Sequence, residues 1–237
     1  MYRDILSEEG GNLNIDSKMQ TGSTRDHIYS LLKEEILKFR LLPGDKISEK
    51  EISDKFKVSR TPVRESFIQL SQEGLLDIYP QKGTCVSLID LNLVEEGRFM
   101  REHLEIAVIQ LACEVFPQEK LFSLEMNLKM QEMCMQEKNY EKLFQLDEEF
   151  HQTIFDGCKK GSIWYVIQNM NMHFKRLRML RLATNLNWGG IYNQHVLIVE
   201  AIRNKKPEVA VKMMKEHLTM VIFDQETLRK EYPTYFK

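Results

Sequence analysis

The chain has 237 residues, and its 33 Lys and Arg residues against 35 Asp and Glu residues give a formal net charge of −2. Charged residues interrupt every apolar stretch before it reaches the roughly 18–20 residues of a membrane span, and the first residues lack the apolar core of a signal peptide. We therefore expect a cytoplasmic protein with no membrane segment. Its four widely spaced cysteines are then expected to be free thiols.

The first predicted elements are an arm and two helices. Residues 1–23 contain three glycines and little periodicity, which predicts a flexible arm. A helix is expected to begin at Thr24 and to end near Arg40. Ser48 and Glu51 have the spacing of a capping box, in which each side chain bonds the backbone N–H of the other residue. That spacing predicts a second, short helix.

A third helix is expected to follow after a short turn. Ser59 or Thr61 can cap it, and Pro62 suits its first turn because an N–H missing there costs nothing. Gly74 is expected to end it. Its apolar stripe comprises Val63, Phe67 and Leu70.

Two extended runs come next, residues 75–79 and 84–88, and residues 80–83 form a tight turn between them. Helix, turn, helix and β-ribbon are typical of a winged helix-turn-helix domain, which places one helix in the DNA major groove. We predict this domain over residues 24–88. Because the chain as a whole is not basic, the positive charge that meets DNA must be local.

Several segments of this region resemble the GntR family of bacterial transcription regulators. They are Leu42-Pro43-Gly44-Asp45-Lys46-Ile47-Ser48-Glu49, Val58-Ser59-Arg60-Thr61-Pro62-Val63-Arg64-Glu65, Glu73-Gly74-Leu75-Leu76, and Gly83-Thr84 with Val86. The resemblance implies a sequence-specific regulator, with repression as the expected mode. The DNA-binding residues that it implies are Lys50, Ser59, Arg60, Thr61, Arg64, Gln81, Lys82 and Gly83. Since one winged helix reads only a short half-site, we expect a homodimer on a palindromic double-stranded operator.

From Asp90 onward the pattern changes to consecutive amphipathic helices without a strand signal. The predicted helices cover residues 91–116, 118–138, 140–158, 162–184, 188–205 and 207–232, with a break at 185–187. They predict an all-helical bundle over residues 89–237 and a mostly α protein of two domains. Methionines clustered at 126–135 and 170–179 are expected to fill gaps in its core.

Polar residues interrupt the inward stripes of three of these helices. Asp147 and His151 are four residues apart, and His195 and His217 lie among apolar residues of two later helices. Burying these groups is costly unless they are paired, and one shared divalent metal would satisfy all four. From this pattern alone, a metal site and a set of separately satisfied core histidines both remain open.

Residues 90–237 also resemble the FCD domain, the all-helical effector domain of the FadR-like branch of the GntR family. The family pattern is Asp-x3-His, then His, then His-Leu, and it matches at Asp147 and His151, at His195, and at His217-Leu218. The resemblance implies that these four polar residues bind one divalent metal. The donors suit Zn²⁺ or Ni²⁺ first, with Mn²⁺ and Fe²⁺ also compatible.

Four protein ligands leave room on a five- or six-coordinate metal for a small carboxylate effector, whose far end an Arg could hold. The family's Arg-x-x-Leu-Glu segment matches Arg101–Glu105, which implies that Arg101 lines the effector pocket. Further pocket candidates are Asn169, His173 and Asn193, with Arg176, Arg178 and Arg181 as weaker ones. A core, surface or ion-pair role is the alternative for each.

The competing function is a metal-dependent hydrolase or lyase that uses the Asp/His site. The sequence has no HExxH helix, no paired acid and base carboxylates and no glycine-rich phosphate loop. The winged helix would also have no role in an enzyme. We therefore expect a regulator rather than an enzyme.

Overall fold

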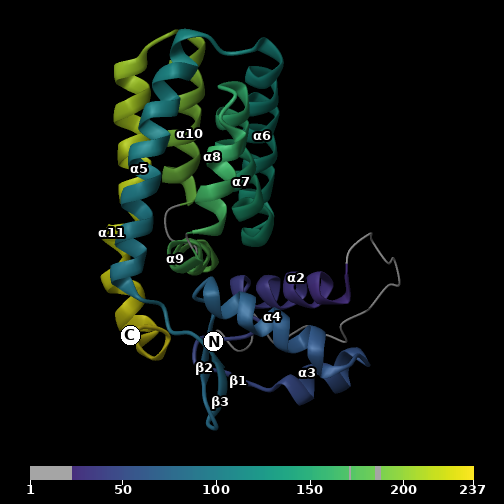
Figure 1. The fold of residues 1–237 in the computed structure, drawn as a ribbon. Coiled ribbons are helices and arrows are strands. Elements are labelled where there is room, and N and C mark those ends of the chain that lie inside the picture. Colours follow the sequence, from purple (N-terminus) through teal and green to yellow (C-terminus); the bar gives the residue numbers. More distant parts are fainter. Residues whose placement is uncertain (1–22, 171, 185–187) are drawn as a thin grey trace. The chain divides into compact units, whose positions relative to one another are not determined.

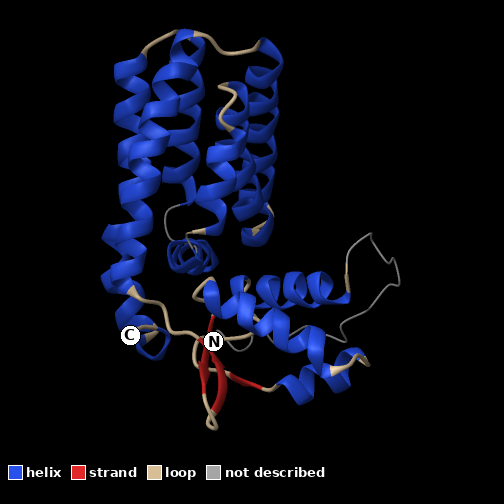
Figure 2. Cartoon of the chain, in the orientation of Figure 1, coloured by secondary structure: helices blue, strands red, loops and turns tan. Residues whose placement is uncertain are grey.

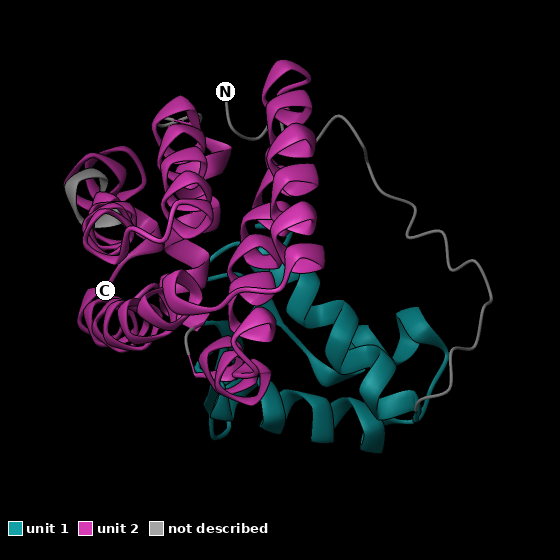
Figure 3. Cartoon of the chain, turned by 90° about the horizontal axis from the view of Figure 1, so that it is seen from above, with its two compact units in different colours: residues 1–88 teal, residues 89–237 magenta. Residues whose placement is uncertain are grey.

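A computed structural model describes residues 23–170, 172–184 and 188–237, without the side chains of residues 221–224. The arm expected over residues 1–23 thus lies, except for Ser23, outside the described residues, as does the break expected at 185–187. The chain divides into two compact units, residues 1–88 and 89–237 (Figure 3). No helix of the described residues is long and apolar enough to cross a membrane. All four cysteines are free thiols, as predicted.

The first unit is a winged helix-turn-helix, which confirms that prediction (Figures 1 and 2). Its elements are α2 (Thr24–Leu37), β1 (Lys46–Ile47), α3 (Glu49–Phe56), α4 (Arg60–Gln72), β2 (Leu76–Tyr79) and β3 (Gly83–Val86). The three strands form an antiparallel sheet of order β1-β3-β2. Strand β1 was not expected, because its two residues become a strand only by pairing with Cys85 and Thr84.

Local chemistry explains where the helices of this unit begin. Ser23 and Asp26 form a capping box at the start of α2, and Ser48 and Glu51 form the predicted one at α3. The buried residues of α2 (Ile28, Leu32 and Ile36) and of α4 (Val63, Phe67 and Leu70) form the core. Gly83, the first residue of β3 after the turn from β2, has φ +105°, a backbone conformation that L side chains rarely adopt.

The second unit is the expected all-helical bundle. Its helices are α5 (Leu91–Glu114), α6 (Gln118–Gln136), α7 (Tyr140–Gly157), α8 (Gly161–Asn169), α9 (Met172–Ala183), α10 (Trp188–Arg203) and α11 (Pro207–Glu231), followed by the 3-10 turn η1 (Pro233–Tyr235). Going around the bundle, α5 packs against α11, α11 against α10, α10 against α6, and α6 against α7. This arrangement places α7, α10 and α11 close enough to contribute to one site.

The single helix predicted over residues 162–184 is wrong, because the structure has two helices there. Helix α9 crosses the bundle instead of continuing α8, and Figure 1 shows it end-on below the long helices. The Asn169 side chain donates to the Tyr165 carbonyl, 2.8 Å away, at the point where α8 ends. Asn side chains that bond nearby backbone groups compete with helical hydrogen bonds, which explains the interruption.

Methionines fill the core only in part. Met172, Met179 and Met214 are buried. The prediction is wrong for Met170, which is 70 % exposed, and for Met126, Met130 and Met133 of α6, which are 42–59 % exposed. The three methionines of α6 lie on the face opposite its buried residues, which are Leu121, Leu124, Asn127, Leu128, Gln131 and Cys134. Periodicity alone does not show which of two apolar faces packs inward.

Gly157→Ala is expected to lower the free energy of unfolding by about 1–3 kcal/mol, because the extra carbon overpacks the core. A Cβ at Gly157 would lie 2.2 Å from Phe116 Cε2. Gly189→Ala in α10 is the matched control, since a Cβ there meets nothing within 4 Å. Urea denaturation of the two variants measures the difference. If both unfold at the same urea concentration as the wild type, the packing of Phe116 on Gly157 is not as described.

Candidate metal centre and nucleic-acid interface

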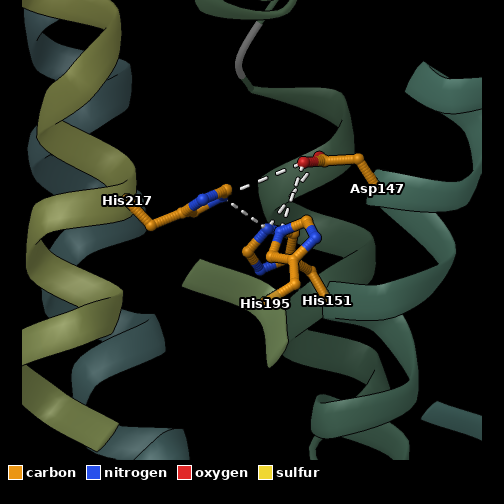
Figure 4. A group of neighbouring side chains, drawn as sticks. All are labelled: Asp147, His151, His195 and His217. Atoms are coloured by element: carbon orange, nitrogen blue, oxygen red, sulfur yellow. Dashed lines mark hydrogen bonds and ion pairs between the residues drawn. The ribbon is translucent and has the colours of Figure 1, made fainter. Parts of the chain in front are cut away.

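The four polar residues that interrupt the helical stripes lie together (Figure 4). Asp147 and His151 are one turn apart on α7, His195 comes from α10 and His217 from α11. Their ligand atoms all lie within 4.8 Å of one another, and all four residues are buried. His151 Nε2 is 3.2 Å from His217 Nε2, and His195 Nε2 is 3.5 Å from Asp147 Oδ1.

The protonation states of this cluster suit a metal. Burial lowers the pKa of His195 to about 3, and burial together with the neighbouring histidines holds the pKa of His217 well below its usual value. Burial raises the pKa of Asp147, but the nearby Arg178 and His151 outweigh it, and the net pKa is lowered. The Asp147 carboxylate and the neutral imidazoles of His195 and His217 are therefore available, the forms in which these groups bind metals.

One buried ring nitrogen of the cluster has no hydrogen bond. His195 Nε2 is buried and has no hydrogen-bond partner among the described residues. A buried acceptor without a donor is costly, and a cation at this point would satisfy it. Three imidazole nitrogens and one carboxylate oxygen are a usual donor set for Zn²⁺ or Ni²⁺. The residues thus fit a divalent metal ion.

Sequence analysis did not single out the side chains that contact the Nδ1 atoms of His151 and His195. His151 Nδ1 lies 2.5 Å from Glu105 Oε2, and His195 Nδ1 lies 2.9 Å from Gln131 Oε1. Glu105 and Gln131 are polar residues within the buried faces of α5 and α6. The same signal that pointed to the histidines, a polar residue on an apolar stripe, could have found them.

A small cavity adjoins the cluster. Asp147 and His217 line it together with two buried arginines, Arg178 and Arg181. Arg178 also forms ion pairs with Asp147 and with Glu148. The remaining lining residues are Phe174, Leu182, Ile191 and Leu218. Two guanidinium groups beside a cation site favour an anionic ligand with a small apolar part.

Arg101 reaches the cluster through Glu105, which lies against His151. It is 1 % exposed, its Nε donates to Glu105 Oε1 at 2.5 Å, and its guanidinium lies over the Trp164 ring. It lines a second small cavity together with Glu148 and Arg178.

The other predicted effector residues do not line the cavity beside Asp147. His173 is buried, accepts a hydrogen bond from the Asp90 backbone N–H at 3.1 Å, and has its pKa lowered to about 4 by burial and by Arg176. Asn169 bonds the Tyr165 carbonyl and Asn193 is exposed. The structure therefore brings the weaker candidates Arg178 and Arg181 to the cluster instead.

The predicted DNA-binding residues are exposed on the first unit. Lys50 lies at the start of α3; Ser59, Arg60, Thr61 and Arg64 lie at the start of α4; Gln81, Lys82 and Gly83 lie at the turn between β2 and β3. Ser59 is the N-cap of α4, but its side chain makes no capping hydrogen bond. Arg64 forms two hydrogen bonds with Glu49, at 3.0 and 3.1 Å, which hold its guanidinium at the helix surface.

Comparison with known proteins decides the family. Residues 24–86 match the family model for bacterial regulatory proteins of the gntR family, and residues 98–220 match the FCD domain. The transcriptional repressor RspR of Escherichia coli K12 is 31 % identical over 216 residues, which cover 91 % of this chain and 95 % of that protein. The chain belongs to the GntR family. It is a GntR transcription regulator with an FCD domain, and not an enzyme.

Further similar proteins include another transcriptional regulator and two solved structures of the same fold. An HTH-type transcriptional regulator of Streptomyces ambofaciens is 34 % identical over 215 residues, covering 90 % of each chain. The solved structure of E. coli McbR/YncC has a TM-score of 0.73 and 18 % identity, and the match covers 89 % of this chain and 99 % of that one. A GntR protein of Rhodococcus sp. RHA1 has a TM-score of 0.72 and 17 % identity, with 85 % and 99 % covered. At such identities, the structures show the fold alone.

Proposed function

We propose that this GntR regulator is a metal-dependent, effector-responsive repressor. Asp147, His151, His195 and His217 hold one divalent metal ion, with Zn²⁺ or Ni²⁺ suited best and Mn²⁺ or Fe²⁺ compatible. The observation that supports the site is the convergence of four buried donors from three helices within 4.8 Å. RspR of E. coli is named a transcriptional repressor, which supports repression.

The effector of this proposal is a small organic acid. A metal held by Asp147 and the three histidines would supply a fixed positive charge for its carboxylate. Arg178 and Arg181 line the adjoining cavity and offer the planar, paired N–H donors that carboxylates prefer. Arg101 contacts the same region indirectly, through its interactions with Glu105 and Glu148. The apolar lining of the cavity, which includes Phe174 and Leu218, then accommodates the carbon part of the acid.

The proposal is tested by measuring the metal content of the purified protein and its operator affinity during titration with small carboxylic acids. We expect one divalent ion per chain, and an acid that changes operator affinity only when the metal is present. Protein that takes up no divalent metal after reconstitution contradicts the metal site. A metal-loaded protein whose operator affinity no acid changes contradicts the effector part. A ligand must favour one DNA-binding state over another, or it shifts nothing.

Lys50→Ala is expected to weaken binding to every DNA sequence and to reduce the salt dependence of binding by about one counterion. Lys50 is exposed at the start of α3. In this proposal its ammonium group contacts a phosphate, which carries no sequence information. Fluorescence anisotropy with operator and random DNA at several salt concentrations measures both effects. A loss confined to the operator would show that Lys50 reads sequence instead.

We expect a homodimer that binds a palindromic operator. Two winged helices on half-sites one helical turn apart, or a multiple of it, give the specificity that one half-site lacks. Sedimentation of the protein alone and with operator DNA measures the stoichiometry. A monomer at micromolar concentration that binds one protein per operator would contradict this assembly.

A further inference from the structure

Two of the three histidines of the proposed metal site have a buried polar side chain beside Nδ1, the ring nitrogen that faces away from the other donors. A neutral imidazole carries its hydrogen on one nitrogen and binds a metal with the other. In the structure, the Nε2 atoms of His151, His195 and His217 face one another and Asp147. Metal binding through Nε2 therefore requires the hydrogen of each ring to be on Nδ1. A hydrogen-bond acceptor beside Nδ1 favours this tautomer.

For His151 that group is Glu105 of α5. Glu105 is 1 % exposed, and its Oε2 is 2.5 Å from His151 Nδ1. Its other oxygen, Oε1, accepts a hydrogen bond from Arg101 Nε at 2.5 Å. A carboxylate held in this way by Arg101 can only accept from His151, so the neutral ring carries its hydrogen on Nδ1 and keeps the lone pair on Nε2.

For His195 the group is Gln131 of α6, and the direction of its amide follows from a chain of hydrogen bonds. The Leu146 carbonyl can only accept, and Asn127 Nδ2 donates to it at 3.0 Å. Asn127 Oδ1 is then the acceptor for Gln131 Nε2 at 2.6 Å. This leaves Gln131 Oε1 facing His195 Nδ1 at 2.9 Å. Because an amide oxygen accepts, His195 must donate from Nδ1 and leave Nε2 for the metal.

His217 differs from the other two histidines. Its Nδ1 is buried and has neither a hydrogen bond nor an ion pair among the residues that the structure describes. His151 Nδ1 makes no aligned hydrogen bond either, but the Glu105 carboxylate lies 2.5 Å from it. No outer group therefore selects the tautomer of His217. The two histidines with partners come from α7 and α10, whereas His217 comes from α11.

We infer that Glu105 and Gln131 are positioning residues, which set the metal-binding tautomers of His151 and His195 before the metal arrives. This inference rests on the proposed metal site. Outer partners of this kind typically contribute 10–100-fold in metal affinity, because they orient the ring and raise its basicity. Helices α5 and α6 thus take part in metal binding although neither contributes a ligand.

The test uses the full chain with Zn²⁺ and Ni²⁺ alone as probes. Glu105→Gln and Gln131→Leu are expected to lower metal affinity by about 10–100-fold in competition with a chelator. The amide of Glu105→Gln must turn its oxygen to Arg101 Nε and its NH2 group to His151 Nδ1, whereas Gln131→Leu leaves no acceptor for His195. Gln131→Glu keeps an oxygen acceptor for His195 and is expected to bind metal nearly as the wild type does. Glu102→Gln is the matched control, since Glu102 is a buried acid of the same helix α5 that pairs with Arg98 instead of a histidine.

A second readout needs no metal. Nitrogen-15 NMR of the histidine rings in the metal-free protein is expected to show His151 and His195 with N–H at Nδ1. Glu105→Gln should change only the signal of His151, and Gln131→Leu only that of His195. Unchanged tautomers and unchanged metal affinity in both variants would overturn the positioning role. Wild-type protein that binds neither ion overturns the proposed function instead, and the tautomers then decide the positioning role separately.

Discussion

His217→Ala is expected to purify without metal and to lose the effector response while it still binds operator DNA. The substitution removes one of four ligands, so the affinity should fall by more than the roughly 10–100-fold that loss of an outer partner causes. DNA binding should persist because the winged helix has its own core and lies in the other compact unit. Metal content is measured by elemental analysis, and operator affinity by anisotropy with and without effector.

His103→Ala is the control for this prediction. His103 is exposed on α5 and bonds the Phe99 carbonyl, so its loss should leave metal content and effector response unchanged. Equal metal content in His217→Ala and wild type would eliminate the site. A metal-free variant that still responds to the effector would make the metal structural and place the switch elsewhere.

Thermal unfolding gives an independent check on the same variant. A ligand that binds only the folded state stabilises it by about 2.7 kcal/mol at a free concentration of 100 times its Kd. Wild-type protein should therefore melt at a higher temperature after metal is added, because the ion joins α7, α10 and α11. His217→Ala should show little of this shift. An equal shift in both proteins would indicate that the metal binds at another site.

Arg64→Ala is expected to lose about 1–3 kcal/mol of operator affinity, the usual value of a bidentate contact with a base. Arg64 is 67 % exposed near the start of α4, the helix that a winged helix-turn-helix places in the major groove. Its two bonds with Glu49 hold the guanidinium on this surface in the free protein. To contact a base, Arg64 must therefore break its bonds with Glu49 and form new ones with the DNA.

Arg25→Ala is the matched control, since Arg25 is an exposed arginine of the same unit that pairs with its neighbour Asp26. Anisotropy with operator and random DNA compares the two variants. The expected result is a loss of preference for the operator in Arg64→Ala alone. Operator binding by Arg64→Ala as tight as that of the wild type would show that α4 is not the recognition helix.

Local chemistry in the sequence was sufficient for most of the elements and for the buried faces of several helices, but not for β1 or for the division of residues 162–184. Ser48 and Glu51 predicted the start of α3, since a capping box depends only on residues three apart. The stripe of Val63, Phe67 and Leu70 predicted the buried face of α4. Asp147 and His151 could be singled out in the same way, because polar residues on a buried stripe need a partner.

The family resemblance added what periodicity could not. It joined His195 and His217 to Asp147 and His151 although the four residues come from three helices. Periodicity left metal ligands and separate core histidines equally open, because it shows that a residue points inward but not which residues it meets. The structure brings the four donor groups within 4.8 Å of one another.

Only the tertiary structure decided the rest. Contacts between helices far apart in the chain placed Glu105 on His151, Gln131 on His195 and Arg178 beside Asp147. The division of residues 162–184 into α8 and α9 placed Arg178 and Arg181 in the cavity, where the sequence had suggested Arg101. A sequence determines which face of a helix is apolar through spacing along one chain segment. Which side chains from other helices complete a site depends on how the helices cross, and that is a property of the packed bundle.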